Sequence, residues 1–156
     1  MPKNHTKYIL SSEDTVPASA PRTGTIEVAL DSQFVVGTGT EFKSDKRIVE
    51  GDWIFANGEV RRIERIISDE SIYLEEAFTA AVDPATALLV TKASRAREIS
   101  LVNIGGGAAT IDGSALAAGG ALIFDETMLY RGVQRDYPDP LVVDASLSDV
   151  DVLIVY

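Results

Sequence analysis

The stretch VEGDWIFANGEVRRIERIISDESIYL, residues 49–74, decides the fold. It begins with the short apolar run Trp53-Ile54-Phe55, which is followed by Asn57-Gly58. Both central residues of a type I′ turn need a positive φ, which Asn and Gly adopt at low cost, so this pair predicts a two-residue hairpin. The chain returns through residues 59–67 and turns again at residues 68–71. The whole stretch therefore predicts a β-meander, the element from which a small barrel or sandwich is built.

The return strand of this meander does not alternate cleanly between apolar and polar residues. Val60 and Ile63 fall on opposite faces of a regular strand, because successive side chains point to opposite sides. One extra residue in the strand would shift the register and bring both side chains to the inner face. The sequence therefore predicts a β-bulge near Arg61-Arg62, with both apolar residues inside.

The segment before the meander divides into an arm and the first strands of a barrel. Residues 1–23 hold three prolines, and Tyr8-Ile9-Leu10 is their only apolar cluster. This composition predicts an extended N-terminal arm that becomes ordered only by docking. Residues 25–30 alternate with period two, which is typical of a half-buried strand. We therefore expect a small β-barrel over residues 24–93.

The second half of the chain is a series of short apolar segments separated by glycine-rich turns. It follows a charged linker at residues 94–97 and contains a further hairpin signal at Asp112-Gly113. Strands this short, at this spacing, are typical of a β-sandwich, which we expect over residues 98–156. The predicted fold class is all-β: a small β-barrel followed by a β-sandwich, with an extended N-terminal arm.

Composition and charge exclude several classes of function. The chain has no cysteine, which excludes thiolate metal sites and cysteine nucleophiles, and no apolar run long enough to span a membrane. Its net charge is −10, and from Glu98 onward nine acidic residues face two basic ones. Such an acidic half disfavours binding to a phosphate backbone, so we expect no direct nucleic-acid partner and no membrane partner. The excess charge either keeps the protein soluble or meets a basic surface or a cation.

The residues that could carry chemistry do not form a recognisable catalytic or cofactor pattern. Gly105-Gly106-Gly107 lacks the following helix and lysine of a phosphate loop, and His5 has no second histidine or cysteine to share a metal with. The C-terminal aspartates lack the regular spacing of a dedicated calcium loop. We therefore expect no enzyme activity and no cofactor. The aspartates considered are Asp136, Asp139, Asp144, Asp149 and Asp151.

Residues 36–42, 49–54 and 62–74, together with Phe78, form three segments that resemble a recurrent β-domain in virion proteins of tailed bacteriophages. The segments are Val36-Gly37-Thr38-Gly39-Thr40-Glu41-Phe42, then Val49-Glu50-Gly51-Asp52-Trp53-Ile54, then residues 62–74 with Ser68-Asp69-Glu70-Ser71 at their turn, and Phe78. In the second half, residues 99–103, 109–113 and 116–120 are similar to strand-turn-strand repeats in head and tail accessory domains. The pattern is structural, so it carries over no catalytic residue.

The resemblance implies a non-enzymatic, oligomeric virion structural protein that binds copies of itself and neighbouring capsid, neck, head-to-tail or tail proteins. A second hypothesis is a receptor- or carbohydrate-binding module of a phage fibre or spike, in which two tyrosines stack on a sugar. A cell-wall hydrolase has only abundant carboxylates in its favour. The expected contact residues are Tyr8, Ile9 and Leu10 in the arm, Arg61, Arg62 and Arg65 facing an acidic neighbour, and Tyr130 and Tyr137 in the long loop after residue 124.

Overall fold

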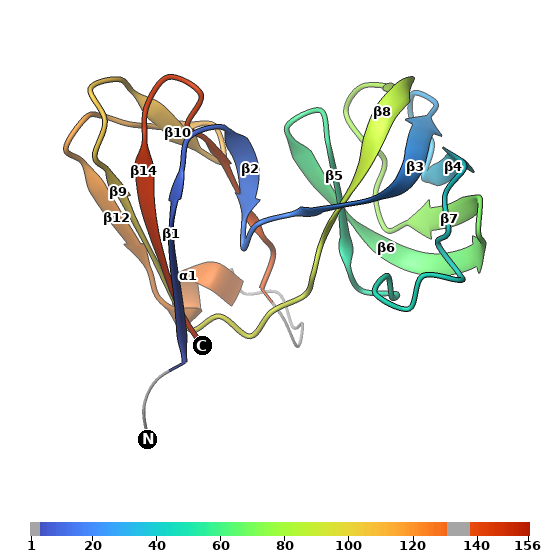
Figure 1. Cartoon of the computed structure of the whole chain (residues 1–156), viewed down its shortest axis with the longest axis horizontal. Coiled ribbons are helices and arrows are strands. Elements are labelled where there is room, and N and C mark those ends of the chain that lie inside the picture. Colours follow the sequence, from blue (N-terminus) through green and yellow to red (C-terminus); the bar gives the residue numbers. More distant parts are fainter. Residues whose placement is uncertain (1–3, 131–137) are drawn as a thin grey trace. The chain divides into compact units, whose positions relative to one another are not determined.

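The chain folds into two all-β units (Figure 1). The computed structural model describes residues 4–130 and 138–156, without the side chains of residues 127 and 130. The barrel unit is continuous and spans Ala18–Lys92. The discontinuous unit joins Met1–Pro17 to Ala93–Tyr156. The described helix is α1 (Glu126–Tyr130), a single turn, and no described helix has the length and apolar character needed to cross a membrane.

The barrel unit is a closed six-stranded antiparallel barrel, which confirms the predicted fold of this region. Its strands follow one another around the barrel in the order β3-β4-β7-β6-β5-β8. The strands are β3 (Ala20–Val28), β4 (Phe34–Thr38), β5 (Trp53–Ala56), β6 (Glu59–Ser68), β7 (Ser71–Leu74) and β8 (Val82–Thr91). The first and last strands pair with each other, Ala20 opposite Val90, so the chain enters and leaves the barrel at adjacent points.

The turn at the centre of the meander has the predicted geometry. Asn57 has a φ of 52° and Gly58 a φ of 70°, as a type I′ turn requires. Strands β5 and β6 pair from Ala56 opposite Glu59 to Trp53 opposite Arg62 without interruption. The β5–β6 hairpin predicted from residues 49–67 is therefore confirmed.

The predicted bulge in β6 exists, but its place was wrong. Pairing with β5 is regular through Arg61 and Arg62. The register shifts instead occur against β7, between Ile63 and Arg65 and again between Ile66 and Ser68. The first shift leaves Ile63 opposite Leu74 and Ile66 opposite Ile72, so these two isoleucines share the inner face. Val60 stays on the opposite side of the strand from Ile63, next to Phe55.

The barrel encloses one cluster of buried apolar side chains. Phe42, which lies in the loop after β4, is fully buried in it, and Phe78 lies in it after β7. Trp53 and Phe55 are buried but lie outside this cluster, because β5 directs Ile54 and Ala56 inward. The cluster is Ile26, Val28, Val35, Phe42, Ile48, Ile54, Ala56, Ile63, Ile72, Leu74, Phe78, Val82, Leu88 and Val90.

The discontinuous unit contains two four-stranded sheets. One has the order β1-β14-β9-β12 and the other β11-β10-β13-β2. The pairings within both sheets are antiparallel. The strands are β1 (His5–Leu10), β2 (Glu13–Val16), β9 (Glu98–Asn103), β10 (Ala109–Ile111), β11 (Ser114–Leu116), β12 (Ala121–Phe124), β13 (Leu141–Asp144) and β14 (Val150–Val155).

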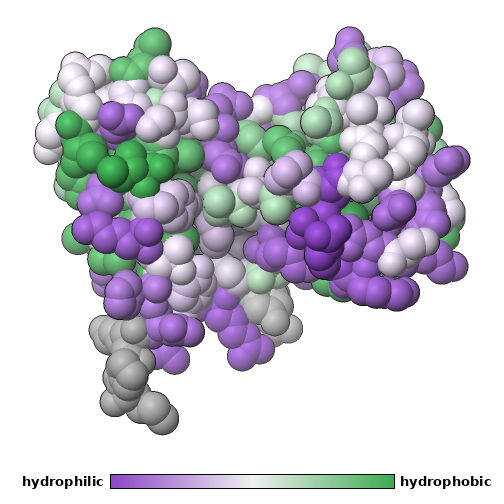
Figure 2. All heavy atoms as spheres, in the orientation of Figure 1, coloured by the Kyte–Doolittle hydropathy of each residue, from purple (hydrophilic) through white to green (hydrophobic). Residues whose placement is uncertain are grey.

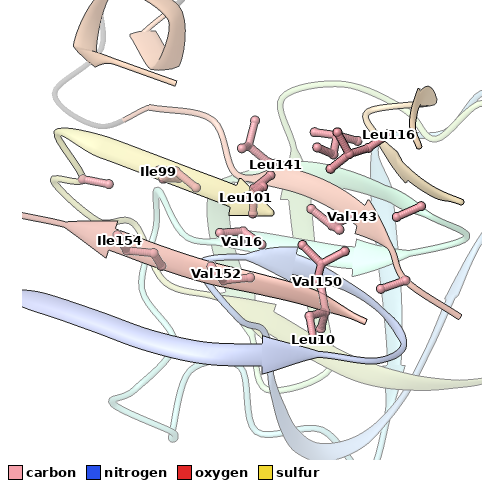
Figure 3. Packing of buried hydrophobic residues seen from close by; sticks show 14 of the residues in the cluster. Leu10, Val16, Ile99, Leu101, Leu116, Leu141, Val143, Val150, Val152 and Ile154 are labelled. Carbon is pink, nitrogen blue, oxygen red and sulfur yellow. The ribbon is translucent and has the colours of Figure 1, made fainter. Parts of the chain in front are cut away.

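Both sheets contribute side chains to the same apolar cluster (Figure 3). Val150, Val152 and Ile154 alternate along β14, and Leu141 and Val143 face them from β13 of the other sheet. All five are buried. Alternation at period two is what lets each strand direct one row of apolar side chains into this cluster. The unit therefore has a core of its own, separate from the barrel core.

The structure differs from the expectation of an extended arm over residues 1–23. Strand β1 pairs with β14 from His5 opposite Val155 to Leu10 opposite Val150, and β2 pairs with β13. Ala20 already belongs to barrel strand β3. Local composition suggested an arm because β1 and β2 are short, largely polar strands at sheet edges, and their partners lie more than 120 residues away in the sequence.

Candidate interaction surfaces

The three predicted arm residues lie on β1 and divide between its two faces. Leu10 is buried in the apolar cluster, and Tyr8 packs against that cluster. Burial, together with the negative charge of Asp14 and Tyr156, raises the pKa of the Tyr8 hydroxyl. Ile9 points to the other face and is 60% exposed. Of the three, Ile9 is therefore the residue that is most available to a partner.

Ile9 belongs to a row of mixed polarity on the outer face of its sheet. Residues directly opposite in antiparallel strands point to the same side, and the pairing aligns Ile9 with Asp151, Val102 and Ala121. The next row aligns Lys7, Leu153, Ser100 and Ile123. Figure 2 shows hydrophobic residues gathered over this sheet of the discontinuous unit. This face therefore combines two exposed aliphatic side chains, Ile9 and Ile123, with an ion pair between Lys7 and Asp151 at 3.8 Å.

The three predicted arginines of β6 are not equivalent. Arg61 forms an ion pair with Glu59 and lies over the ring of Phe78, and Arg62 pairs with Glu75 at 2.8 Å. Both side chains are thus held within the barrel unit. Arg65 is exposed and has no ion pair with any residue that the structure describes.

Arg65 belongs to a ladder of three side chains in contact, Arg65, Tyr73 and Phe34, which crosses strands β6, β7 and β4. Its guanidinium carbon lies 5.4 Å from the centre of the Tyr73 ring, and that ring meets Phe34 edge-on at 5.2 Å. Tyr73 lies between the other two because β7 pairs with both β6 and β4. A hollow of about 490 Å³ beside the ladder is lined by Gln33, Glu50, Glu64, Arg65 and Tyr73.

A second hollow of about 450 Å³ adjoins Glu50 on the same barrel. Four apolar side chains, two lysines and Glu50 line it, and the Glu50 carboxylate accepts from the Ile66 N–H of β6 at 3.1 Å. The residues that line it are Phe42, Lys43, Lys46, Ile48, Val49, Glu50 and Ile66.

The two predicted tyrosines of the long loop cannot be compared with the expectation. Tyr130 is the last residue of α1, and its side chain is outside the described part of the structure. Tyr137 lies outside the described residues altogether. The carbohydrate hypothesis that rests on them stays a prediction.

Two of the segments that carry the phage resemblance are hydrogen-bonded to each other. Thr40 Oγ1 donates to the backbone oxygen of Asp69 at 2.6 Å, and the Phe42 N–H donates to the same oxygen at 3.2 Å. The Asp69 carboxylate accepts from the N–H groups of Lys43 and Ser44 and from the Ser44 hydroxyl. These bonds, led by the Ser44 hydroxyl, lower the pKa of Asp69.

The remaining motif residues also serve the barrel itself. A Cβ on Gly37 would lie 2.0 Å from Thr40 Oγ1, so only glycine allows this approach. The Asp52 side chain is buried, accepts from the Val49 N–H at 3.0 Å and receives the Lys92 ammonium at 2.5 Å. The motif residues thus fix three loops at one end of the barrel, and the polar groups named here are hydrogen-bonded within the barrel unit.

A buried asparagine that the sequence did not reveal organises the loops of the discontinuous unit. Asn103 Nδ2 donates to the carbonyl oxygens of Gly107 and Leu116, each at 2.8 Å. Its Oδ1 accepts from the Ser148 hydroxyl at 2.6 Å and from the Gly105 N–H at 3.3 Å. No local pattern could signal this site, because its partners come from three separate segments: the loop after β9, the end of β11 and the loop before β14.

Several carboxylates have lowered pKa values: hydrogen bonds from Thr79 and the charge of Arg61 outweigh burial at Glu59, and two others accept hydrogen bonds within tight turns. The Arg47 side chain lowers the pKa of Asp45 to about 2, and the Ser146 hydroxyl and N–H lower that of Asp144. Burial and then the facing carboxylate of Asp144 raise the pKa of Glu13. No group of three or more metal-ligating side chains occurs among residues 4–130 and 138–156.

The division into units also changes the picture of charge. The barrel unit holds 13 acidic and 8 basic residues, and the discontinuous unit holds 11 and 6, so each has a net charge of −5. The acidic excess after Glu98 is balanced in part by basic residues of the N-terminal strands and the linker. Opposite overall charge therefore does not distinguish the two units.

Comparison with protein-family models, curated proteins and solved structures finds no match for the chain.

Proposed function

We propose that this chain is a non-enzymatic structural protein of a tailed-bacteriophage virion. It assembles with copies of itself and with neighbouring capsid, head-to-tail or tail proteins, and it resides in the particle. The observation that carries the proposal is the resemblance in residues 36–42, 49–54 and 62–74, whose members make specific contacts with one another in the barrel.

The contacts of these motif residues favour a scaffolding role. Thr40 and Asp69 hold the loop after β4 against the turn between β6 and β7, and Asp52 holds the loop before β5 to Lys92 at the end of the barrel. Motif residues that serve to fix loops are typical of a domain that functions through contacts of its outer surface and has no reactive cleft. The turn-capping roles of Asp45, Asp69 and Asp144 point the same way, since a general acid or base needs a pKa near the working pH.

We further propose that the two sheets of the discontinuous unit form a β-sandwich, made of the region expected for it, residues 98–156, together with β1 and β2. Its support is the single apolar cluster to which β14 and β9 contribute from one sheet and β13 and β10 from the other. Two β-units, one inserted in the sequence of the other and each with its own core, provide several outer faces for contacts within an assembly.

Quantitative mass spectrometry of purified phage particles tests the proposal. Particles of a phage that encodes this chain are purified on a density gradient and washed in high salt, and the chain is quantified against the major capsid protein. We expect a fixed copy number per particle that survives the wash, because closed assemblies contain defined numbers of subunits. Absence of the chain from washed particles, while it is present in the infected-cell lysate, would refute the proposal.

A further inference from the structure

The discontinuous unit exposes two large aliphatic side chains on adjoining loops. Leu147 lies between β13 and β14 and is 80% exposed, and Ile104 lies just after β9 and is 54% exposed. The two loops touch, since a Cβ on Gly107 would lie 2.0 Å from the Leu147 carbonyl oxygen. Exposure of an aliphatic side chain to water has a free-energy cost, and burial of that side chain against a partner removes it.

These loops are held in place by the Asn103 network. Ser148 donates its hydroxyl to Asn103 and its N–H to the Ala145 carbonyl at 3.1 Å, so hydrogen bonds lie on both sides of Leu147. The Ile104 N–H donates to the Asp149 carbonyl at 2.9 Å. Because this loop is already ordered, binding of Leu147 by a partner costs the loop little conformational entropy.

The barrel unit has a hollow that suits such a side chain. Phe42, Ile48, Val49 and Ile66 give it an apolar lining, and its volume of about 450 Å³ is within the range of pockets that hold small ligands. Val49 is itself exposed, so part of this apolar surface faces solvent.

The charges around the loop and the hollow are complementary. Lys43 and Lys46 line the hollow and are exposed, and neither has an ion pair within the described part of the chain. The charge of Lys43 helps to lower the pKa of Asp69, and the Lys46 ammonium donates to the Lys43 carbonyl at 3.4 Å. Asp144 and Asp149 flank Leu147 in the sequence, and the bonds that Asp144 accepts from the Ser146 hydroxyl and N–H lower its pKa. Glu50 also lines this hollow, and it lines the hollow of about 490 Å³ beside Arg65 as well.

We propose that the 144–149 loop of one copy inserts Leu147 into the hollow formed by Phe42, Ile48, Val49 and Ile66 of a second copy, with Lys43 and Lys46 facing Asp144 and Asp149. This inference rests on the proposed function, because it names the contact by which copies of the chain assemble. Loop and hollow are different surfaces, so the contact is heterologous and each copy can both give and receive. Repetition closes into a ring or extends as a filament.

Sedimentation velocity of the full chain at roughly 1–500 μM tests the contact. We expect the wild type to self-associate with rising concentration, and Leu147→Asp to weaken this ~10- to 100-fold, the loss expected when burial of one leucine is removed. Lys43→Glu/Lys46→Glu weakens it from the other side. Leu30→Asp, which changes a leucine 60% exposed in the turn after β3, is the matched control and leaves association unchanged.

Mixing the two defective proteins tests that the contact is heterologous. Leu147→Asp keeps an intact hollow and Lys43→Glu/Lys46→Glu keeps an intact loop, so an equimolar mixture forms a one-to-one dimer that grows no further. Far-UV circular dichroism checks that both variants are folded. A wild type that stays monomeric throughout, a Leu147→Asp protein that associates like wild type, or a mixture without dimer each overturns the inference.

The two proposals fail in different experiments. A chain that is present in washed particles but monomeric in solution overturns the Leu147 contact and leaves the virion role standing. A chain that associates through Leu147 but is absent from particles overturns the virion role and leaves the contact standing.

Discussion

Replacing Asn103 with Asp should destabilise the discontinuous unit by about 3 to 4 kcal/mol at pH 7 and leave the barrel unit unaffected. The substitution keeps the size of the side chain and exchanges an NH₂ group for oxygen. In the native structure that NH₂ group donates to the carbonyl oxygens of Gly107 and Leu116, each at 2.8 Å. After the exchange both carbonyls lose their donor and face a carboxylate oxygen.

The magnitude follows from the two lost bonds. A hydrogen bond contributes about 1 kcal/mol net, and a buried polar group left without a partner costs about 1–3 kcal/mol. Two orphaned carbonyls, relieved in part by local relaxation, give the stated range. Because Asn103 is fully buried, water cannot replace the donor without opening the loops.

The destabilisation should also depend on pH. Burial against two carbonyl oxygens raises the pKa of the introduced carboxyl above its unfolded value of about 3.9. A group whose pKa is raised by folding contributes stability below its unfolded pKa and loses it as the pH rises through its folded pKa. The gap from wild type should therefore shrink between pH 8 and pH 4. Asn103→Ala lacks a carboxyl and should show a gap that does not vary with pH.

Urea unfolding with two probes separates the units. Trp53 is the only tryptophan and lies in β5, so its fluorescence follows the barrel unit. Hydrogen exchange of β9, β13 and β14 follows the discontinuous unit. A loss below about 1 kcal/mol in that unit at pH 7, or a pH dependence no different from that of Asn103→Ala, would refute the reasoning.

Four further outcomes follow from the described contacts. Asp52→Ala should lower the free energy of unfolding of the barrel by about 2–3 kcal/mol in Trp53 fluorescence, because it leaves Lys92 and the Val49 N–H without their buried acceptor; an unchanged urea midpoint would contradict this. Gly37→Ala should destabilise the barrel by about 1–3 kcal/mol, because the new methyl displaces the Thr40 side chain from Asp69. The control Gly39→Ala places its methyl against no neighbouring atom, so its stability should fall only by the cost of the positive φ at that residue. Glu13→Gln should raise the stability at pH 7 by a few tenths of a kcal/mol, because it removes the repulsion from Asp144 directly opposite, and the gain should vanish at low pH, where Glu13 of the wild type is protonated. Strands β1 and β2 should be protected from hydrogen exchange in the free protein, since they are paired with β14 and β13; exchange at the rate of an unstructured peptide would contradict the observed sheets.

Local chemistry made the turns of this protein predictable. Asn57-Gly58 and Asp112-Gly113 each adopt positive φ at both positions, as their residue types require. The broken alternation of β6 correctly indicated a bulge, because Ile63 and Ile66 could not otherwise share a face. Its exact position could not be read from the strand alone, since it depends on the partner: the irregularity lies against β7 and not against β5.

Long-range pairing explains what the sequence could not show. The segment that contains Tyr8 and Leu10 has too few apolar residues to predict a strand by itself, and its partner β14 lies at the other end of the chain. The role of Asn103 depends on three segments that meet only in the folded unit. Arg61 and Arg62 were expected to face a neighbour, yet their nearest carboxylates, Glu59 and Glu75, lie in the same unit.

The position of the barrel between β2 and β9 has a consequence for synthesis on the ribosome. The barrel is contiguous, so it can fold as soon as residue 92 has emerged, whereas β1 and β2 must wait for partners that are translated at least 125 residues later. Once folded, the barrel holds Ala20 beside Val90 and so joins the two halves of the other unit through a short, fixed connection in place of a long flexible one. Closing a shorter loop costs less entropy, so folding of the barrel lowers the entropic cost of bringing the two halves of the discontinuous unit together.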